Sequence, residues 1–245
     1  MAVLVTRPHP DDEATARSLQ ARGFEVLRAP MLRFEALPFR DDDEAQYDAV
    51  LVTSANALRA VESQLKGHRL LTLPVFAVGE HTADAARHAG FNRVTAAKGG
   101  AQALLDLVLK SVKAKQLKKS AALLYLAGTD LAHDLAGELG AHGLTVATQS
   151  TYRMVPASSL PRDVCDAFAA GRIAAVLHYS RRSARAFLDA ARAGGVEISA
   201  LALPQCCISA NVADILHDAG ATQVMAAASA DENALFETLT RALRS

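Results

Sequence analysis

The sequence predicts an α/β protein with two similar halves, each a parallel sheet covered by helices. Three observations favour this class: short apolar runs alternate with helical periodicity, three pairs of segments repeat in order, and the composition is aliphatic. The chain has 245 residues, of which 51% are hydrophobic and 5% aromatic, with no Trp. At roughly 100–200 residues per domain, this length allows one large domain or two small ones.

The strands are expected at short apolar or β-branched runs. They are Val3–Thr6, Glu25–Arg28, Ala49–Thr53, Val75–Val78, Arg93–Ala96, Ala122–Leu126, Thr145–Thr148, Ala174–Tyr179, Gln205–Ser209 and Gln223–Ala226. Segments of helical period lie between them. They are Asp11–Arg22, Ala55–Lys66, His81–Ala89, Ala101–Val112, Asp130–His142, Arg181–Ala193, Asn211–Ala219 and Asp231–Leu243. Alternation of this kind predicts parallel strands with helices on both faces.

Two extended stretches interrupt the alternation, residues 31–38 and 150–156, and each ends in Pro. The acidic stretch over residues 39–48 follows the first of them and is expected to be a solvated linker.

Three pairs of segments match in the same order along the chain. They are Val3–Val26 with Leu123–Val146, Val50–Arg59 with Val176–Arg185, and Ala77–Val94 with Cys207–Val224. Any two strand–helix–strand units look somewhat alike, but three ordered matches favour an internal duplication.

Charge and cysteine content exclude several classes of protein. The 26 basic residues balance the 26 acidic ones, so general nucleic-acid binding is not expected. Cys165, Cys206 and Cys207 form no Cys-x-x-Cys, which argues against a disulfide framework or thiolate zinc site. The chain shows neither a signal-peptide pattern nor ~18 uninterrupted apolar residues. We therefore expect a soluble, cytoplasmic protein that binds neither nucleic acid nor membranes.

Common enzyme motifs are absent: there is no dinucleotide fingerprint, Walker A loop, His-Glu-x-x-His or nucleophile elbow. The eight histidines are scattered without metal-ligand spacing, so no metal site is expected. His81 and His178 lie near strand ends, where they either titrate beside a ligand or serve capping and packing.

Small polar residues and Gly recur where a predicted strand passes into a helix. They are Thr6, Arg7, Thr53, Ser54, Asn56, Gly79, Thr82, Gly128, Thr129, Ser180, Ser183 and Ser209. Taken singly, these turn residues are expected to be helix N-caps. Taken together, they lie at the carboxyl ends of parallel strands, where ligands bind. Helix N-termini there offer N–H donors to carboxylates or phosphates.

In their order and spacing these residues resemble the uroporphyrinogen-III synthase family over essentially the whole chain. The resemblance is carried by residues 3–8, 47–57, 78–83, 143–156 and 176–187. It implies two flavodoxin-like parallel-sheet domains joined by a two-stranded antiparallel ladder. The first domain would comprise residues 1–35 plus 157–245, the second residues 40–149, and the ladder residues 31–38 and 150–156.

The resemblance also implies an activity. Family members convert hydroxymethylbilane, a linear tetrapyrrole, to uroporphyrinogen III with loss of water and inversion of ring D, using no metal or organic cofactor. The expected partner is this small-molecule substrate, the upstream bilane-producing enzyme is a further candidate, and the protein is expected to be a monomer.

Tyr152 matches the family's functional tyrosine, so its hydroxyl is the candidate proton donor to the leaving group. The alternative is that Tyr152 only packs in the ladder. A two-lobed cytosolic module that binds a small molecule or regulates without catalysis is the alternative function.

Overall fold

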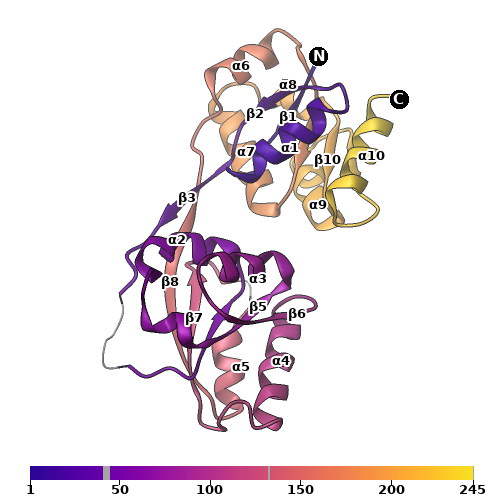
Figure 1. Cartoon of the computed structure of the whole chain (residues 1–245). Helices are drawn as coiled ribbons and strands as arrows, with labels where there is room; N and C mark the ends of the chain where they lie inside the picture. The colour runs from indigo at the N-terminus through magenta and orange to yellow at the C-terminus, as the bar shows by residue number, and fades with distance from the viewer. Residues whose placement is uncertain (41–44, 132, 245) are drawn as a thin grey trace. The chain divides into compact units, whose positions relative to one another are not determined.

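The computed structural model describes residues 1–40, 45–131 and 133–244, which form two compact units (Figure 1). Unit 1 comprises Met1–Phe34 with Met154–Ser245, and unit 2 comprises Glu35–Arg153. Residues 41–44 of the expected linker, and Ala132 within the helix expected over Asp130–His142, lie outside the described residues. No helix of the described ranges is long and apolar enough to span a membrane.

Unit 1 contains a five-stranded parallel sheet in the order β11-β10-β9-β1-β2. The strands are β1 (Ala2–Val5), β2 (Glu25–Arg28), β9 (Ile173–His178), β10 (Gln205–Cys207) and β11 (Val224–Ala226). The helices are α1 (Asp11–Gln20), α6 (Arg162–Ala169), α7 (Arg181–Ala193), α8 (Glu197–Leu201), α9 (Ala210–Asp218) and α10 (Glu232–Ala242). This strand order is that of a flavodoxin-like doubly wound sheet, which confirms the fold implied by the resemblance.

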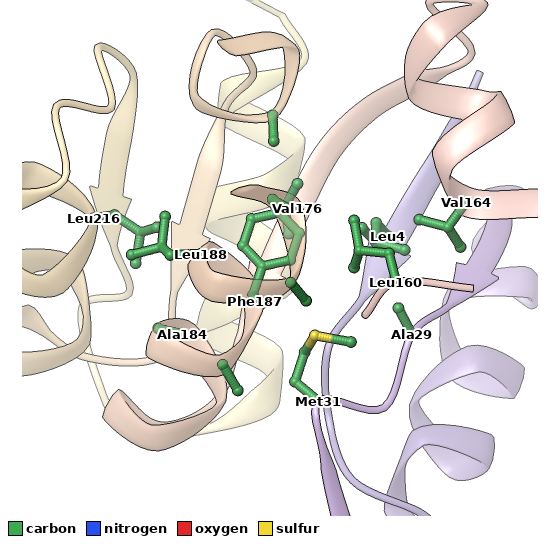
Figure 2. Close-up of a cluster of buried hydrophobic side chains, with 14 of the residues drawn as sticks. Leu4, Ala29, Met31, Leu160, Val164, Val176, Ala184, Phe187, Leu188 and Leu216 are labelled. Atoms are coloured by element: carbon green, nitrogen blue, oxygen red, sulfur yellow. The ribbon is translucent and has the colours of Figure 1, made fainter. Parts of the chain in front are cut away.

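The sheet of unit 1 is buried on both faces, because successive side chains of a strand point in opposite directions. Leu4 of β1 and Val176 of β9 pack against Phe187 of α7 on one face, which α6 and α9 also cover (Figure 2). Val3 and Val5 point to the opposite face, where α1 and α10 supply the packing.

Unit 2 contains a six-stranded sheet in the order β3-β8-β7-β4-β5-β6. The strands are β3 (Leu32–Ala36), β4 (Ala49–Val52), β5 (Pro74–Val78), β6 (Arg93–Ala97), β7 (Ala122–Gly128) and β8 (Thr145–Pro156). The helices are α2 (Ala55–Leu65), a 3₁₀ turn η1 (Arg69–Thr72), α3 (Gly79–His88), α4 (Ala101–Lys113) and α5 (Leu135–Ala141). Leu104 of α4 and Leu139 of α5 bury Leu51 and Leu123 on one face of this sheet.

Strands β3 and β8 are neighbours and form the expected antiparallel ladder. Both strands extend from one unit into the other (Figure 1). Leu37 donates its N–H to the Thr151 carbonyl (2.7 Å), and Arg153 Nε donates to Glu35 Oε2 (2.7 Å). The sequence predicts separate segments over Thr145–Thr148 and 150–156, which is wrong: they form one 12-residue strand.

The three repeated segment pairs occupy equivalent places in the two sheets. Strands β2, β1, β9, β10 and β11 correspond in spatial order to β8, β7, β4, β5 and β6. The register agrees as well: Leu4 lies opposite Val176, as its match Leu124 lies opposite Val50. The structure therefore supports the duplication, with the chain entering the second copy at its third strand.

The domain boundaries expected from the sequence remain a prediction that fragments test. We expect residues 40–149 to fold alone, because β4–β7 and their helices carry a core of their own. A fragment of residues 1–119 should not fold, since it separates β1 from its neighbour β9 and β4 from its neighbour β7. Circular dichroism and urea unfolding measure both. Cooperative unfolding of the second fragment, with the first disordered, would indicate two sequential domains instead.

Candidate active site

The predicted site residues lie at one edge of each sheet, where the parallel strands end. In unit 1, Thr6 and Arg7 follow β1, Ser180 follows β9 and Ser209 follows β10. In unit 2 the corresponding residues end or follow β4, β5 and β7, or lie in the helices after them: Thr53, Ser54, Asn56, Gly79, Thr82, Gly128 and Thr129. The structure thus gathers them into two sets, each at the edge where open α/β sheets bind ligands.

Two of the serines cap helices as expected. Ser54 Oγ accepts from the N–H of Asn56 (3.2 Å) at the start of α2, and Ser180 Oγ accepts from the N–H of Ser183 (3.0 Å) in α7. Ser183 is fully buried, and its hydroxyl is hydrogen-bonded to Ser180 Oγ (2.7 Å). Asn56 Oδ1 accepts from Arg59 Nη1 (2.6 Å). Each cap satisfies one of the N–H groups that a helix start leaves unpaired.

The capping role is wrong for three other residues. Thr6 is fully buried and donates to the Leu177 carbonyl (2.8 Å), because α1 begins only at Asp11. The N-cap of α5 is Asp134 and not Thr129, since Asp134 accepts from the N–H of Gly137 (3.0 Å). Ser209 adjoins α9 in an extended conformation, but its side chain makes no capping bond.

The start of helix α3 differs from the starts of α2 and α7. Gly79 has φ of 71°, a left-handed conformation that Gly adopts at least cost. Thr82 lies within α3 and is only 5% exposed, so it is a buried helix residue and not a cap.

Arg7 lies in a network of polar side chains at the end of β1. Its Nη1 donates to Glu232 Oε1 (3.0 Å), and its guanidinium stacks 4.9 Å from the centre of the Tyr179 ring. Thr15 and Tyr179 also donate to Glu232 Oε1. Burial, followed by the Glu232 carboxylate, raises the pKa of Tyr179 above its ordinary value, so this phenol stays neutral and donates.

The network borders a cavity of about 370 Å³ at the carboxyl edge of unit 1. Its lining comes from the ends of β1, β9 and β10 and the start of α10: Arg7, Pro8, Tyr179, Ser180, Ser183, Ile208, Ala230, Asp231 and Glu232. A ligand carboxylate at Arg7 would compete with Glu232 for the guanidinium.

Tyr152 is half-buried on β8, next to the end of β7. It lies opposite Gly128, and its carbonyl accepts the N–H of Thr129 (3.0 Å). A Cβ atom on Gly128 would lie 2.8 Å from Tyr152 Cζ and 3.0 Å from its Oη. The tyrosine ring therefore rests directly on the Gly128 backbone.

Tyr125 is a site residue that sequence reasoning missed. Its hydroxyl is hydrogen-bonded to Thr53 Oγ1 (2.9 Å), so β7 and the turn after β4 meet at this edge. The pKa of Tyr125 is raised, chiefly by burial and also by the nearby Tyr152 hydroxyl. The signal in the sequence is a phenol within the apolar run 122–127, since a buried Tyr hydroxyl needs a partner.

His178 ends β9, but its side chain is fully buried and packs against Phe187 in the core. The Gln205 amide donates to the carbonyls of Ala200 (2.7 Å) and Leu203 (2.9 Å), so its Oε1 faces His178 Nε2 at 2.8 Å as an acceptor. His178 is thus neutral, with the proton on Nε2. Complete burial lowers its pKa to about 4. Among the described residues, no three His, Cys, Asp or Glu side chains gather in a way that could hold a metal ion.

The chain is similar to one protein family in sequence and to solved structures in fold. The family model described as "Uroporphyrinogen-III synthase HemD" matches residues 13–237. No curated protein matched in sequence. Among solved structures, uroporphyrinogen-III synthetase from Helicobacter pylori is 17% identical, with a TM-score of 0.66 over 98% of each chain. A mutant uroporphyrinogen III synthase from the extremely thermophilic bacterium Thermus thermophilus is 18% identical, with a TM-score of 0.62 over 100% of this chain and 99% of that one. At such identities the likeness shows the fold.

Proposed function

Because the chain belongs to the uroporphyrinogen-III synthase family, we infer that it closes hydroxymethylbilane to uroporphyrinogen III with loss of water and inversion of ring D. The observation that carries this conclusion is the family match over nearly the whole chain. A binding or regulatory module without catalysis has no support from the comparisons.

The reaction needs a proton donor for the leaving oxygen and a defined conformation of the bound bilane. As the terminal C–O bond breaks, the oxygen takes a proton and leaves as water, and a cationic azafulvene-like carbon remains. A positioned acid assists this step. Ring D must then reach ring A through its substituted carbon, and only the bound conformation can impose that geometry.

We propose that Tyr152 supplies the proton. Its hydroxyl lies at the carboxyl edge of unit 2 over Gly128, and Tyr125 and Thr53 form a hydrogen-bonded pair nearby. The remaining predicted residues are proposed to bind substrate in two ways. Direct contacts would come from Arg7, Thr53, Ser54, Asn56, Gly79, Gly128, Thr129, Ser180 and Ser209. Thr6, Thr82 and Ser183 are buried, so they would act by holding the turns that carry these groups.

The activity itself is tested by supplying hydroxymethylbilane and separating the two uroporphyrin isomers. We expect isomer III with the protein and the uninverted isomer without it. Tight binding of the bilane with no change in isomer ratio would favour a binding module. We also propose that the protein acts as a monomer in the cytoplasm; sedimentation at assay concentration tests the oligomeric state.

We expect activity to need no metal or added cofactor, since the sequence has neither metal-ligand spacing nor a dinucleotide fingerprint. Dialysis against a strong chelator should leave the rate of isomer III formation unchanged. Loss of activity that a divalent ion restores would contradict this prediction.

A further inference from the structure

The pairing of β7 with β8 changes register beside Tyr152. Ala127 lies opposite Ser150, but Gly128 lies opposite Tyr152, so Thr151 is an extra residue on β8. Such a bulge redirects the side chains that follow it, because a one-residue shift moves a side chain to the other face. The bulge places Tyr152 across from Gly128.

Buried hydrogen bonds hold this bulge on both sides. Thr151 is fully buried, and its hydroxyl contacts the carbonyls of Ala57 (3.3 Å) and Ala127 (3.2 Å). On the other side, the N–H of Thr129 donates to the carbonyl of Tyr152 (3.0 Å). The backbone of Tyr152 is thus fixed, and the contact of its ring with Gly128 limits where the hydroxyl can lie.

Gly128 leaves room for the Tyr152 ring because glycine has no Cβ atom. Its φ lies outside the left-handed region, so alanine could adopt its backbone conformation without strain. The requirement is steric: a Cβ atom would lie 2.8 Å from Cζ and 3.1 Å from Cε1 of Tyr152. To restore ordinary contact, the ring would have to move by about 0.6 Å or more.

We propose that Gly128 is a positioning residue, which seats the Tyr152 ring so that its hydroxyl meets the leaving oxygen. This inference rests on the proposed role of Tyr152, and for Gly128 it replaces the direct substrate contact proposed above. Displacing a catalytic group by a fraction of an ångström lowers turnover without weakening binding.

The test compares Gly128→Ala with Gly140→Ala in the full chain. Gly140 lies in α5, and a Cβ atom there would meet nothing within 4 Å, so it is the matched control. We expect Gly128→Ala to lower kcat about tenfold with KM unchanged, and Gly140→Ala to keep full turnover. Added to Tyr152→Phe, Gly128→Ala should cause no further loss, because the hydroxyl it misplaces is already gone.

Ring-labelled tyrosine gives a readout that does not depend on activity. The chain has four tyrosines, and Tyr152→Phe identifies the Tyr152 resonance. We expect a nuclear Overhauser effect between the Gly128 Hα protons and the Tyr152 ring, and a shifted ring resonance in Gly128→Ala.

Three outcomes would overturn the inference: an unmoved ring with normal kcat in Gly128→Ala, a further tenfold loss in the double variant, or full turnover of Tyr152→Phe. Failure of the wild type to form isomer III would contradict the proposed function instead. The ring resonances would still decide whether Gly128 seats Tyr152.

Discussion

Replacing Tyr152 with phenylalanine is expected to lower kcat by about 100-fold while KM changes by less than about twofold. The ring and its contact with Gly128 are kept, and only the hydroxyl is lost. The effect is set at the low end for general acid catalysis, since an ordered water can take the place of the hydroxyl. Part of the product should also shift to the uninverted isomer, because slow closure on the protein lets released substrate cyclise unaided.

Tyr47→Phe is the matched control for this change. Tyr47 belongs to the same unit but precedes β4, at the opposite end of the strand from Thr53. Turnover, isomer ratio and melting temperature should be measured on the same preparations. Normal turnover and isomer ratio with a lower melting temperature in Tyr152→Phe would mean that the residue only packs in the ladder.

The location of the candidate site could be predicted because parallel strands leave a clear pattern. Ala49–Val52 is apolar and buried along its whole length, as a strand covered on both faces must be. The polar residues that follow, Thr53 and Ser54, then necessarily lie at the carboxyl edge. Topology alone brings such turns together within one sheet.

The starts of helices were less predictable, because the N-cap is decided by competition among nearby polar groups. The sequence predicts a helix from Asp130 with Thr129 before it, whereas α5 begins at Leu135 and Asp134 caps it. The sequence predicts neither of the two short helices α6 and α8. α6 shows buried residues at Val164, Ala167 and Phe168, a single i, i+3, i+4 set that is too brief to establish a period.

The environment of Tyr152 was the least predictable part. The bond between Tyr125 and Thr53 joins residues 72 positions apart and depends on the register of β7 against β4. The bulge at Gly128 is a one-residue shift within an extended run, and no alternation of apolar residues reveals it. Sequence patterns locate strands, whereas interstrand register sets the distances between their side chains.

Acid is expected to destabilise unit 1 through His178. A folded-state pKa of about 4, against 6.5 for a free imidazole, means that the unfolded chain binds a proton that the folded chain excludes. Above pH ~6.5 both states are neutral, and the stabilisation from the buried neutral ring is fully present. It is lost as the pH falls towards 4, at up to about 1.4 kcal/mol per pH unit.

Through this one group the free energy of unfolding therefore falls by about 3 kcal/mol, a large share of a typical stability of about 5–15 kcal/mol. The substitution His178→Gln should remove this pH-dependent loss. The Gln amide reaches about as far as imidazole Nε2, so it can donate to Gln205 Oε1 without titrating. It also removes Nδ1, which has no hydrogen-bond partner among the described residues.

His217→Gln supplies the control, because His217 is exposed on α9 in the same unit. The free energy of unfolding should be measured with urea at several pH values between 4 and 7. We expect the wild type and His217→Gln to lose about 3 kcal/mol more than His178→Gln as the pH falls across this range. Equal losses in all three proteins would show that the proton enters His178 without cost. The assignment of a neutral histidine, held by Gln205 and covered by Phe187, would then be wrong.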